Sequence, residues 1–167
     1  TTTDSAVREA VNELLRLGVL HGYEDNTIRE ANPITRAELA KMIVHTFELK
    51  SKDETAAAFA DVEPNAWYYK YASALAGLGI MEAKDGRFDP QATVTDAELV
   101  QIVAKALKRD VKSVQHWMSG YYSAGQSATR GETAYLLRTA HQSIPSDRAK
   151  ITSVRPLNAI TLIVTFD

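Results

Sequence analysis

Two arginines stand at positions suited to holding an anion. Arg36 follows Thr35 and Arg130 follows Thr129, each at the expected first turn of a helix. A guanidinium group matches a planar carboxylate with two parallel hydrogen bonds. The free N–H groups and the positive dipole end of a helix N-terminus add to that attraction. The two positions therefore predict contact with an acidic ligand, and the competing interpretation is a solvated charge or a surface salt bridge.

The remaining residues show no constellation typical of catalysis. The chain has no cysteine, which excludes disulfides, thiolate metal sites and cysteine nucleophiles. It has no His-Glu-x-x-His pattern, no nucleophile elbow and no phosphate-binding glycine loop. The four histidines are scattered without metal-ligand spacing: His21, His45, His116 and His141. We therefore expect no enzyme, no cofactor and no metal site.

Composition narrows the classes of partner. The chain has 167 residues, 45% of them hydrophobic, which suffices for one compact domain with a buried core. Its 19 basic and 21 acidic residues give a net charge of −2, which argues against a nucleic-acid partner. No apolar run approaches the roughly 20 residues that span a bilayer, so no membrane insertion is expected.

A short pattern, Thr-x-(Ala/Gly)-Glu, occurs three times. It is typical of a capping box, in which the Thr hydroxyl accepts from the backbone N–H three residues on and the Glu reaches back to the Thr N–H. The predicted caps are Thr35 with Glu38, Thr95 with Glu98, and Thr129 with Glu132. Apolar residues at helical spacing follow each box, so each pattern predicts the start of an amphipathic helix.

Another apolar segment at helical spacing precedes each box, and Gly18 and Gly79 stand as C-caps of the first two. The sequence therefore predicts a mainly α fold of three helix-loop-helix repeats. A single repeat cannot bury its own apolar face, which favours three packed around a common axis. The predicted division is repeat one at 1–50, repeat two at 51–108, a degenerate repeat three at 109–142, a linker at 143–150 and a short β segment at 151–167.

The second repeat carries an ordered set of motifs that resembles the S-layer homology repeat. The set runs Phe59-Ala-Asp61-Val, Trp67, Gly79-Ile80, Gly86-x-Phe88-x-Pro90 and Thr95-x-Ala-Glu98, and Ile34-Thr-Arg-Ala-Glu38 repeats its last element. The resemblance covers roughly residues 5–142. It implies a pseudo-threefold assembly around a central helix bundle, with grooves between repeats. The β segment resembles the opening of an immunoglobulin-like domain.

In this family the grooves bind secondary cell-wall polysaccharide, often pyruvylated, and so anchor surface proteins to the wall. The resemblance thus implies a secreted, non-enzymatic anchor at a bacterial cell wall or S-layer. Its partners would be an acidic, pyruvylated polysaccharide and, in a lattice, other copies of the protein. The candidate carbohydrate-binding residues are Arg36, Arg130, Asp61, Trp67, Tyr68 and Gly79. The aromatic rings would stack on sugar faces, and Asp61 would accept hydrogen bonds from sugar hydroxyls.

Departures from the family pattern leave an alternative open. Asp96 stands where the family prefers Arg or Lys and would repel a carboxylate. The first repeat lacks the Phe-x-Asp-Val lead-in, and the third has a shortened loop and Gly131 within its box. We therefore expect fewer than three working grooves. The alternative is a protein-interaction or self-assembly scaffold that has lost sugar binding. For Trp67 itself, packing into the core competes with sugar contact, because the residue lies on the apolar face of its expected helix.

Overall fold

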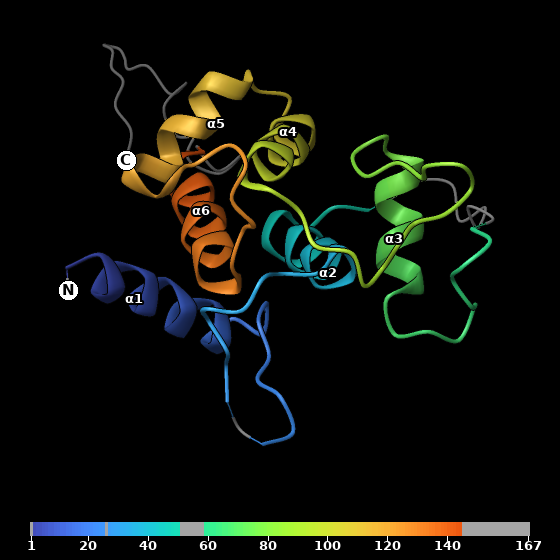
Figure 1. Ribbon diagram of the computed structural model, residues 1–167, viewed down its shortest axis with the longest axis horizontal. Coiled ribbons are helices and arrows are strands. Elements are labelled where there is room, and N and C mark those ends of the chain that lie inside the picture. Colours follow the sequence, from blue (N-terminus) through green and yellow to red (C-terminus); the bar gives the residue numbers. More distant parts are fainter. Residues whose placement is uncertain (1, 26, 51–58, 145–167) are drawn as a thin grey trace, which may run out of the picture.

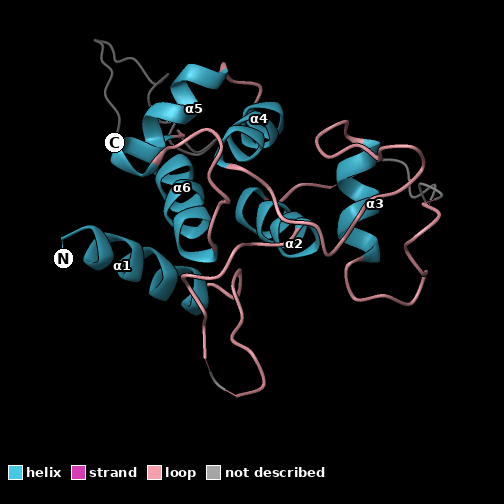
Figure 2. Ribbon diagram, in the orientation of Figure 1, coloured by secondary structure: helices cyan, strands magenta, loops and turns pink. Residues whose placement is uncertain are grey.

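The computed structural model describes residues 2–25, 27–50 and 59–144, and this part of the chain is mainly α-helical, as predicted (Figure 2). Most of the predicted linker and the whole β segment lie outside the described residues. The elements are α1 (Thr2–Arg16), α2 (Arg36–Phe47), α3 (Tyr69–Gly77), α4 (Asp96–Leu107), α5 (Val111–Met118), the 3-10 helix η1 (Ser119–Tyr121) and α6 (Arg130–Ser143). None of the described helices is both long enough and apolar enough to cross a membrane.

Capping boxes start α2, α4 and α6. At the first, the Glu38 N–H donates to Thr35 Oγ1 over 3.2 Å, and the Thr35 N–H donates to Glu38 Oε1 over 3.0 Å. The same reciprocal pair joins Thr95 to Glu98 and Thr129 to Glu132. Each box satisfies backbone donors that a helix N-terminus otherwise leaves free, so local sequence fixes these three helix starts.

The helices pack across repeats in a cycle. Helix α3 of the second predicted repeat packs against α2 of the first, and α5 of the third packs against α4 of the second (Figure 1). Helix α1 of the first repeat closes the cycle by packing against α6 of the third. Helices α1 and α3 therefore bury their apolar faces on a neighbouring repeat, whereas α5 packs against α4 and also against α6 of its own predicted repeat.

Backbone hydrogen bonds join the three capped helix starts in a closed ring. The residue after each capping Thr donates its N–H to the loop of the next repeat: Arg36 to Ala92 O (2.8 Å), Asp96 to Gln126 O (2.8 Å) and Arg130 to Asn32 O (2.9 Å). Isolated β-bridges follow the same cycle, pairing Thr35 with Thr93, Thr95 with Ser127, and Thr129 with Pro33. A pseudo-threefold arrangement of the repeats requires such a cycle.

The loop between the two helices of a repeat is anchored by one apolar side chain. Phe88 anchors the second loop and is fully buried against the core, with Phe59 at 5.3 Å between ring centroids. Ile28 takes the equivalent place in the first loop and is partly buried. These anchors hold the loop backbone against the N-terminus of the preceding or following capped helix, where the ring of hydrogen bonds forms.

Gly131 is required by close packing at the junction of the third and first repeats. A Cβ at this position would lie 2.7 Å from Val7 Cγ1 and 3.1 Å from the Glu30 carbonyl oxygen. Alanine occupies the equivalent positions, Ala37 and Ala97. The substitution Gly131→Ala should therefore lower the free energy of unfolding by about 1–3 kcal/mol, even though alanine is the better helix former. Urea unfolding measures this change.

Gly125→Ala is the matched control, because nothing lies within 4 Å of a Cβ built there. The double substitution Val7→Ala with Gly131→Ala should recover part of the loss by removing the closest contact. If Gly131→Ala proved as stable as Gly125→Ala, the close approach of α1 to the start of α6 would be wrong.

Candidate functional site: a groove at the first repeat

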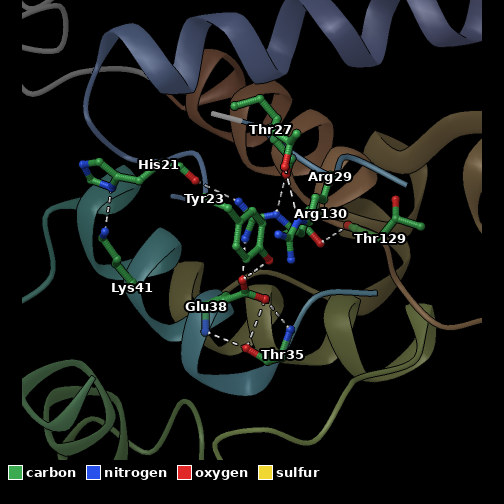
Figure 3. Close-up of polar contacts among 11 residues, drawn as sticks. His21, Tyr23, Thr27, Arg29, Thr35, Glu38, Lys41, Thr129 and Arg130 are labelled. Carbon is green, nitrogen blue, oxygen red and sulfur yellow. Dashed lines mark hydrogen bonds and ion pairs between the residues drawn. The ribbon is translucent and has the colours of Figure 1, made fainter. Parts of the chain in front are cut away.

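A groove of about 610 Å³ lies between the loop after α1, helix α2, the start of α6 and the segment before α3. Its lining residues are Val19, Leu20, His21, Gly22, Tyr23, Glu24, Asp25, Arg29, Glu38, Lys41, Met42, Trp67 and Arg130. Residues from all three predicted repeats thus meet here, and the ring of backbone hydrogen bonds fixes their relative positions. Figure 3 shows the polar side chains at its centre.

Arg130 lies at the base of this groove with its guanidinium held on three sides. It donates through Nε to Ile28 O (3.0 Å), through Nη2 to His21 O (2.9 Å) and through Nη1 to Glu38 Oε2 (2.5 Å) (Figure 3). The residue is only 3% exposed. Such a buried pair is costly to break because the remaining charge would be left without a partner. The contacts make Arg130 a bridge between the third and first repeats.

Tyr23 completes the cluster around Glu38. Its hydroxyl donates to Glu38 Oε2 over 2.8 Å, and its ring lies beneath two guanidinium groups, Arg29 at 3.8 Å and Arg130 at 4.7 Å from the ring centroid. Burial, together with the hydrogen bond to Glu38, raises the pKa of the Tyr23 hydroxyl. Tyr23 therefore stays a neutral donor, and its ring face adds cation–π stabilisation to the arginines.

Lys41 and Trp67 form another part of the groove. Lys41 lies one turn after Glu38 on α2, and its ammonium donates to Nδ1 of His21 over 2.6 Å (Figure 3). The ammonium is also 5.9 Å from the centroid of the Trp67 ring. Burial, with the charges of Arg130 and Lys70, lowers the pKa of Lys41. Trp67 is 54% exposed, so the interpretation that it packs into the core is wrong: it precedes α3 and presents a free aromatic surface.

Arg36 occupies the equivalent junction between the first and second repeats. Its Nε donates to Phe88 O (2.7 Å), its Nη2 donates to Glu82 O (3.1 Å), and its guanidinium lies 4.9 Å from the Phe88 ring centroid. The adjoining cavity measures only about 80 Å³. Arg36 and Arg130 thus make the same pair of bonds to backbone carbonyls, but only Arg130 borders a groove large enough for a sugar.

Asp96 replaces arginine at the third junction and reverses the direction of the hydrogen bond. Its Oδ2 accepts from the Ser123 N–H over 2.9 Å, whereas Oδ1 has no hydrogen-bond partner among the described atoms. The residue is fully buried. Burial, reinforced by the charge of Glu132, raises the pKa of the Asp96 carboxyl against the opposing Ser123 hydrogen bond. The carboxyl therefore holds the shortened third loop and does not face a groove.

The other predicted binding residues are spread over the second repeat. Asp61 accepts from the N–H groups of Phe88 (2.9 Å) and Asp89 (2.8 Å), so its carboxylate holds the second loop. Although burial opposes it, these bonds lower the pKa of Asp61. Tyr68 is half-buried, packed edge-on against Trp67 at 5.2 Å. Gly79, at φ 72°, terminates α3 beside a different hollow. Of these residues and Trp67, only Trp67 lines the groove.

The sequence does not predict several residues of the groove, among them His21, Tyr23, Arg29 and Lys41. The sequence does contain a signal for Lys41, because residues three apart on a helix share a face and the capping box places Glu38 in the first turn of α2. His21 and Tyr23 lie in a loop without helical periodicity, so only the ring of contacts between repeats shows where they point.

Two segments of the chain, residues 1–40 and 58–100, match the model of the S-layer homology domain. They lie in the first and second predicted repeats and together make up about half of the chain. The chain therefore contains two segments of the S-layer homology family. The predicted third repeat lies outside the matched segments.

Relatives agree with this match. The chain is 28% identical over 125 residues to the surface-layer 125 kDa protein of Lysinibacillus sphaericus, covering 68% of this chain and 10% of the relative. It is 29% identical over 126 residues to the surface layer protein of Brevibacillus choshinensis, covering 73% and 11%. An amylopullulanase of Thermoanaerobacterium thermosulfurigenes is 27% identical over 104 residues, covering 62% and 6%.

The chain thus spans about a tenth of the length of the two surface-layer relatives. These matches place it among bacterial proteins of the cell wall or S-layer surface.

Because the carboxyl of Asp96 is buried, we expect it to lower the free energy of unfolding in a pH-dependent way. Because its pKa in the folded state is raised, the ionised form opposes folding, and stability falls as pH rises from about 4 through the raised pKa. Asp96→Asn keeps an oxygen for the Ser123 N–H but carries no charge. It should therefore raise the free energy of unfolding by about 1 kcal/mol at pH 7 and change it little near pH 3. Urea unfolding between pH 3 and 8 measures the difference.

Asp110→Asn serves as a control of opposite sign. Asp110 accepts from the Ser113 N–H and hydroxyl, which lower the pKa of its carboxyl. Its stabilisation is present above the unfolded pKa and is lost as pH falls, so Asp110→Asn should destabilise at pH 7 and not at pH 3. Equal pH profiles for the parent and Asp96→Asn would contradict a buried, charge-sensitive Asp96.

Proposed function

We propose that this chain is a non-enzymatic anchoring module that binds an acidic, pyruvylated cell-wall polysaccharide in the groove at the first repeat. The observation that supports it is the pairing, in one groove, of an exposed Trp67 ring with the ammonium of Lys41. An aromatic face stacks on the apolar face of a sugar, and a cation pairs with a carboxylate. The groove is of the size that small ligands occupy.

The relatives support a role separate from catalysis. The relatives that match this chain include two proteins named as surface-layer proteins and one named as an enzyme, an amylopullulanase. A segment shared by such different proteins supplies what they have in common, and attachment to the cell surface is a function they can share. Within the described residues no cluster of three or more His, Cys, Asp or Glu side chains forms a metal site.

One observation favours the alternative, a scaffold for self-assembly. The guanidinium groups of Arg36 and Arg130, which the sequence predicts as ligand contacts, bond to backbone carbonyls between repeats. Their first role is to hold the module together. The anchoring proposal therefore rests on Trp67 and Lys41, at the open part of the groove, and treats the two arginines as supports.

Trp67→Ala tests the anchoring proposal without disturbing the core. Calorimetric titration with a synthetic pyruvylated amino-sugar and with purified wall polysaccharide should show binding by the parent and at least about tenfold weaker binding by Trp67→Ala. The thermal midpoint should change little, because the ring is largely exposed. Arg130→Ala is unsuitable here, since it removes the ionic partner of the partly buried Glu38 and the bonds that join the third repeat to the first.

Leu78→Ala is the control, because Leu78 is exposed and lines the separate hollow beside Gly79. It should bind as the parent does. Absence of binding by the parent to either ligand would contradict anchoring. Concentration-dependent association of the parent in sedimentation experiments, together with that absence, would favour the scaffold.

A further inference from the structure

The cations that line the groove at the first repeat differ in how their charge is compensated. Arg130 pairs with Glu38, and Arg29 lies 3.4 Å from Asp25. Lys41 has no carboxylate partner among the described residues; its contact is the imidazole of His21 at 2.6 Å. Figure 3 shows this pair apart from the Tyr23, Glu38 and Arg130 cluster. Lys41 is therefore the groove cation whose charge is left for a ligand.

The surroundings of Lys41 also favour the binding of an anion beside its ammonium group. Its ammonium is partly buried, and the nearby charges of Arg130 and Lys70 oppose its own, so its pKa is lowered. A carboxylate placed beside the ammonium would relieve both effects, since an opposite charge favours the protonated form. An ammonium also has three donors, of which the His21 contact uses one.

We infer that Lys41, positioned by His21, is the residue that selects acidic over neutral sugars, and that it confines acidic-ligand binding to the first repeat. This inference rests on the proposed function, because it names the chemistry by which the same groove recognises its ligand. The carboxylate of the sugar bonds to the Lys41 ammonium while the ring of the sugar lies on Trp67, within reach of the same ammonium.

The second repeat shows why selection is confined to the first. Arg130 bonds to His21 O as Arg36 bonds to Glu82 O, which makes Glu82 the counterpart of His21. Gln101 is the counterpart of Lys41, one turn after its own capping Glu. Both counterparts line a hollow of about 770 Å³.

At the two counterpart positions, the second hollow has the amide of Gln101 in place of the Lys41 ammonium and the carboxylate of Glu82 in place of the His21 imidazole. Its lining residues, all described, include no aromatic ring. Its basic residues are Lys105, Lys108 and Arg109. They lie in the last turn of α4, at its C-cap and just after it, away from the position equivalent to Lys41. The second hollow thus has neither the platform nor the cation at the positions that the first groove uses.

Lys41→Gln is the decisive variant, because glutamine already occupies the equivalent position of α4 and suits the helix. Calorimetric titrations of the parent and the variant would use two probes: the pyruvylated amino-sugar and the same sugar without the pyruvyl group. The parent should bind the pyruvylated sugar more tightly. Lys41→Gln should lower that affinity by about tenfold or more and leave the affinity for the neutral sugar nearly unchanged.

Lys105→Gln, the same change on α4 outside the groove, should leave both affinities unchanged. If Lys41→Gln lost affinity for both sugars equally, or for neither, the inference would be overturned while the proposed function would still stand. Failure of the parent to bind either sugar would overturn the proposed function and the inference with it. A Lys105→Gln variant that lost the pyruvylated sugar would place acidic recognition in the second hollow and would also overturn the inference.

Discussion

The structure depends on the backbone N–H groups at the starts of three helices. A capping box satisfies the third residue of its helix but leaves the first two donors free. Here the loop of the next repeat accepts them: Arg36 and Ala37 donate to Ala92 and Pro90 of the second repeat. The same two bonds recur at each junction, with Asp96 and Ala97 bonded to the third repeat. The repeats are therefore joined through donors that no isolated repeat can satisfy.

The side chain at the first helical position then determines whether it donates or accepts hydrogen bonds at each junction between repeats. Arginine donates to backbone carbonyls of the adjoining loop at two junctions, whereas Asp96 accepts from a backbone N–H at the third. The space beside the two arginines differs, because Arg130 borders a groove of about 610 Å³ and Arg36 a cavity of about 80 Å³. Structural support and ligand recognition are thus divided between neighbouring residues, with Arg130 at the base of the groove and Lys41 and Trp67 at its open part.

Much of the fold could be predicted from the sequence because its signals are local. The Thr-x-x-Glu pattern fixes the starts of α2, α4 and α6, and Gly18 and Gly79 end their helices at φ 73° and 72°. The requirement for Gly131 could not be predicted, because it arises from Val7 and Glu30 of the first repeat. The sequence shows only that Gly131 differs from the alanine at the equivalent positions. The packing of Val7 and Glu30 explains why glycine is needed there.

The site could be predicted less well, because its residues converge from all three predicted repeats. A basic residue at a helix start predicts an anion contact, yet the carbonyls of Ile28 and His21 already hold Arg130. Trp67 was identified as a candidate by its residue type, and its exposure agrees with that role. The spacing from Glu38 places Lys41 on the same face of α2, but its contacts with His21 and Trp67, both distant in sequence, follow only from the packing.

Native-state hydrogen exchange at the amides of Arg36, Asp96 and Arg130 tests most directly whether the three junctions form one closed ring. If they do, all three amides should exchange only through global unfolding, with the same free energy of opening as the whole described region. The matching dependence of their exchange on denaturant would show that they open together. Exchange of the Asp96 amide through a smaller, local opening, with Arg36 and Arg130 still protected, would contradict a closed ring.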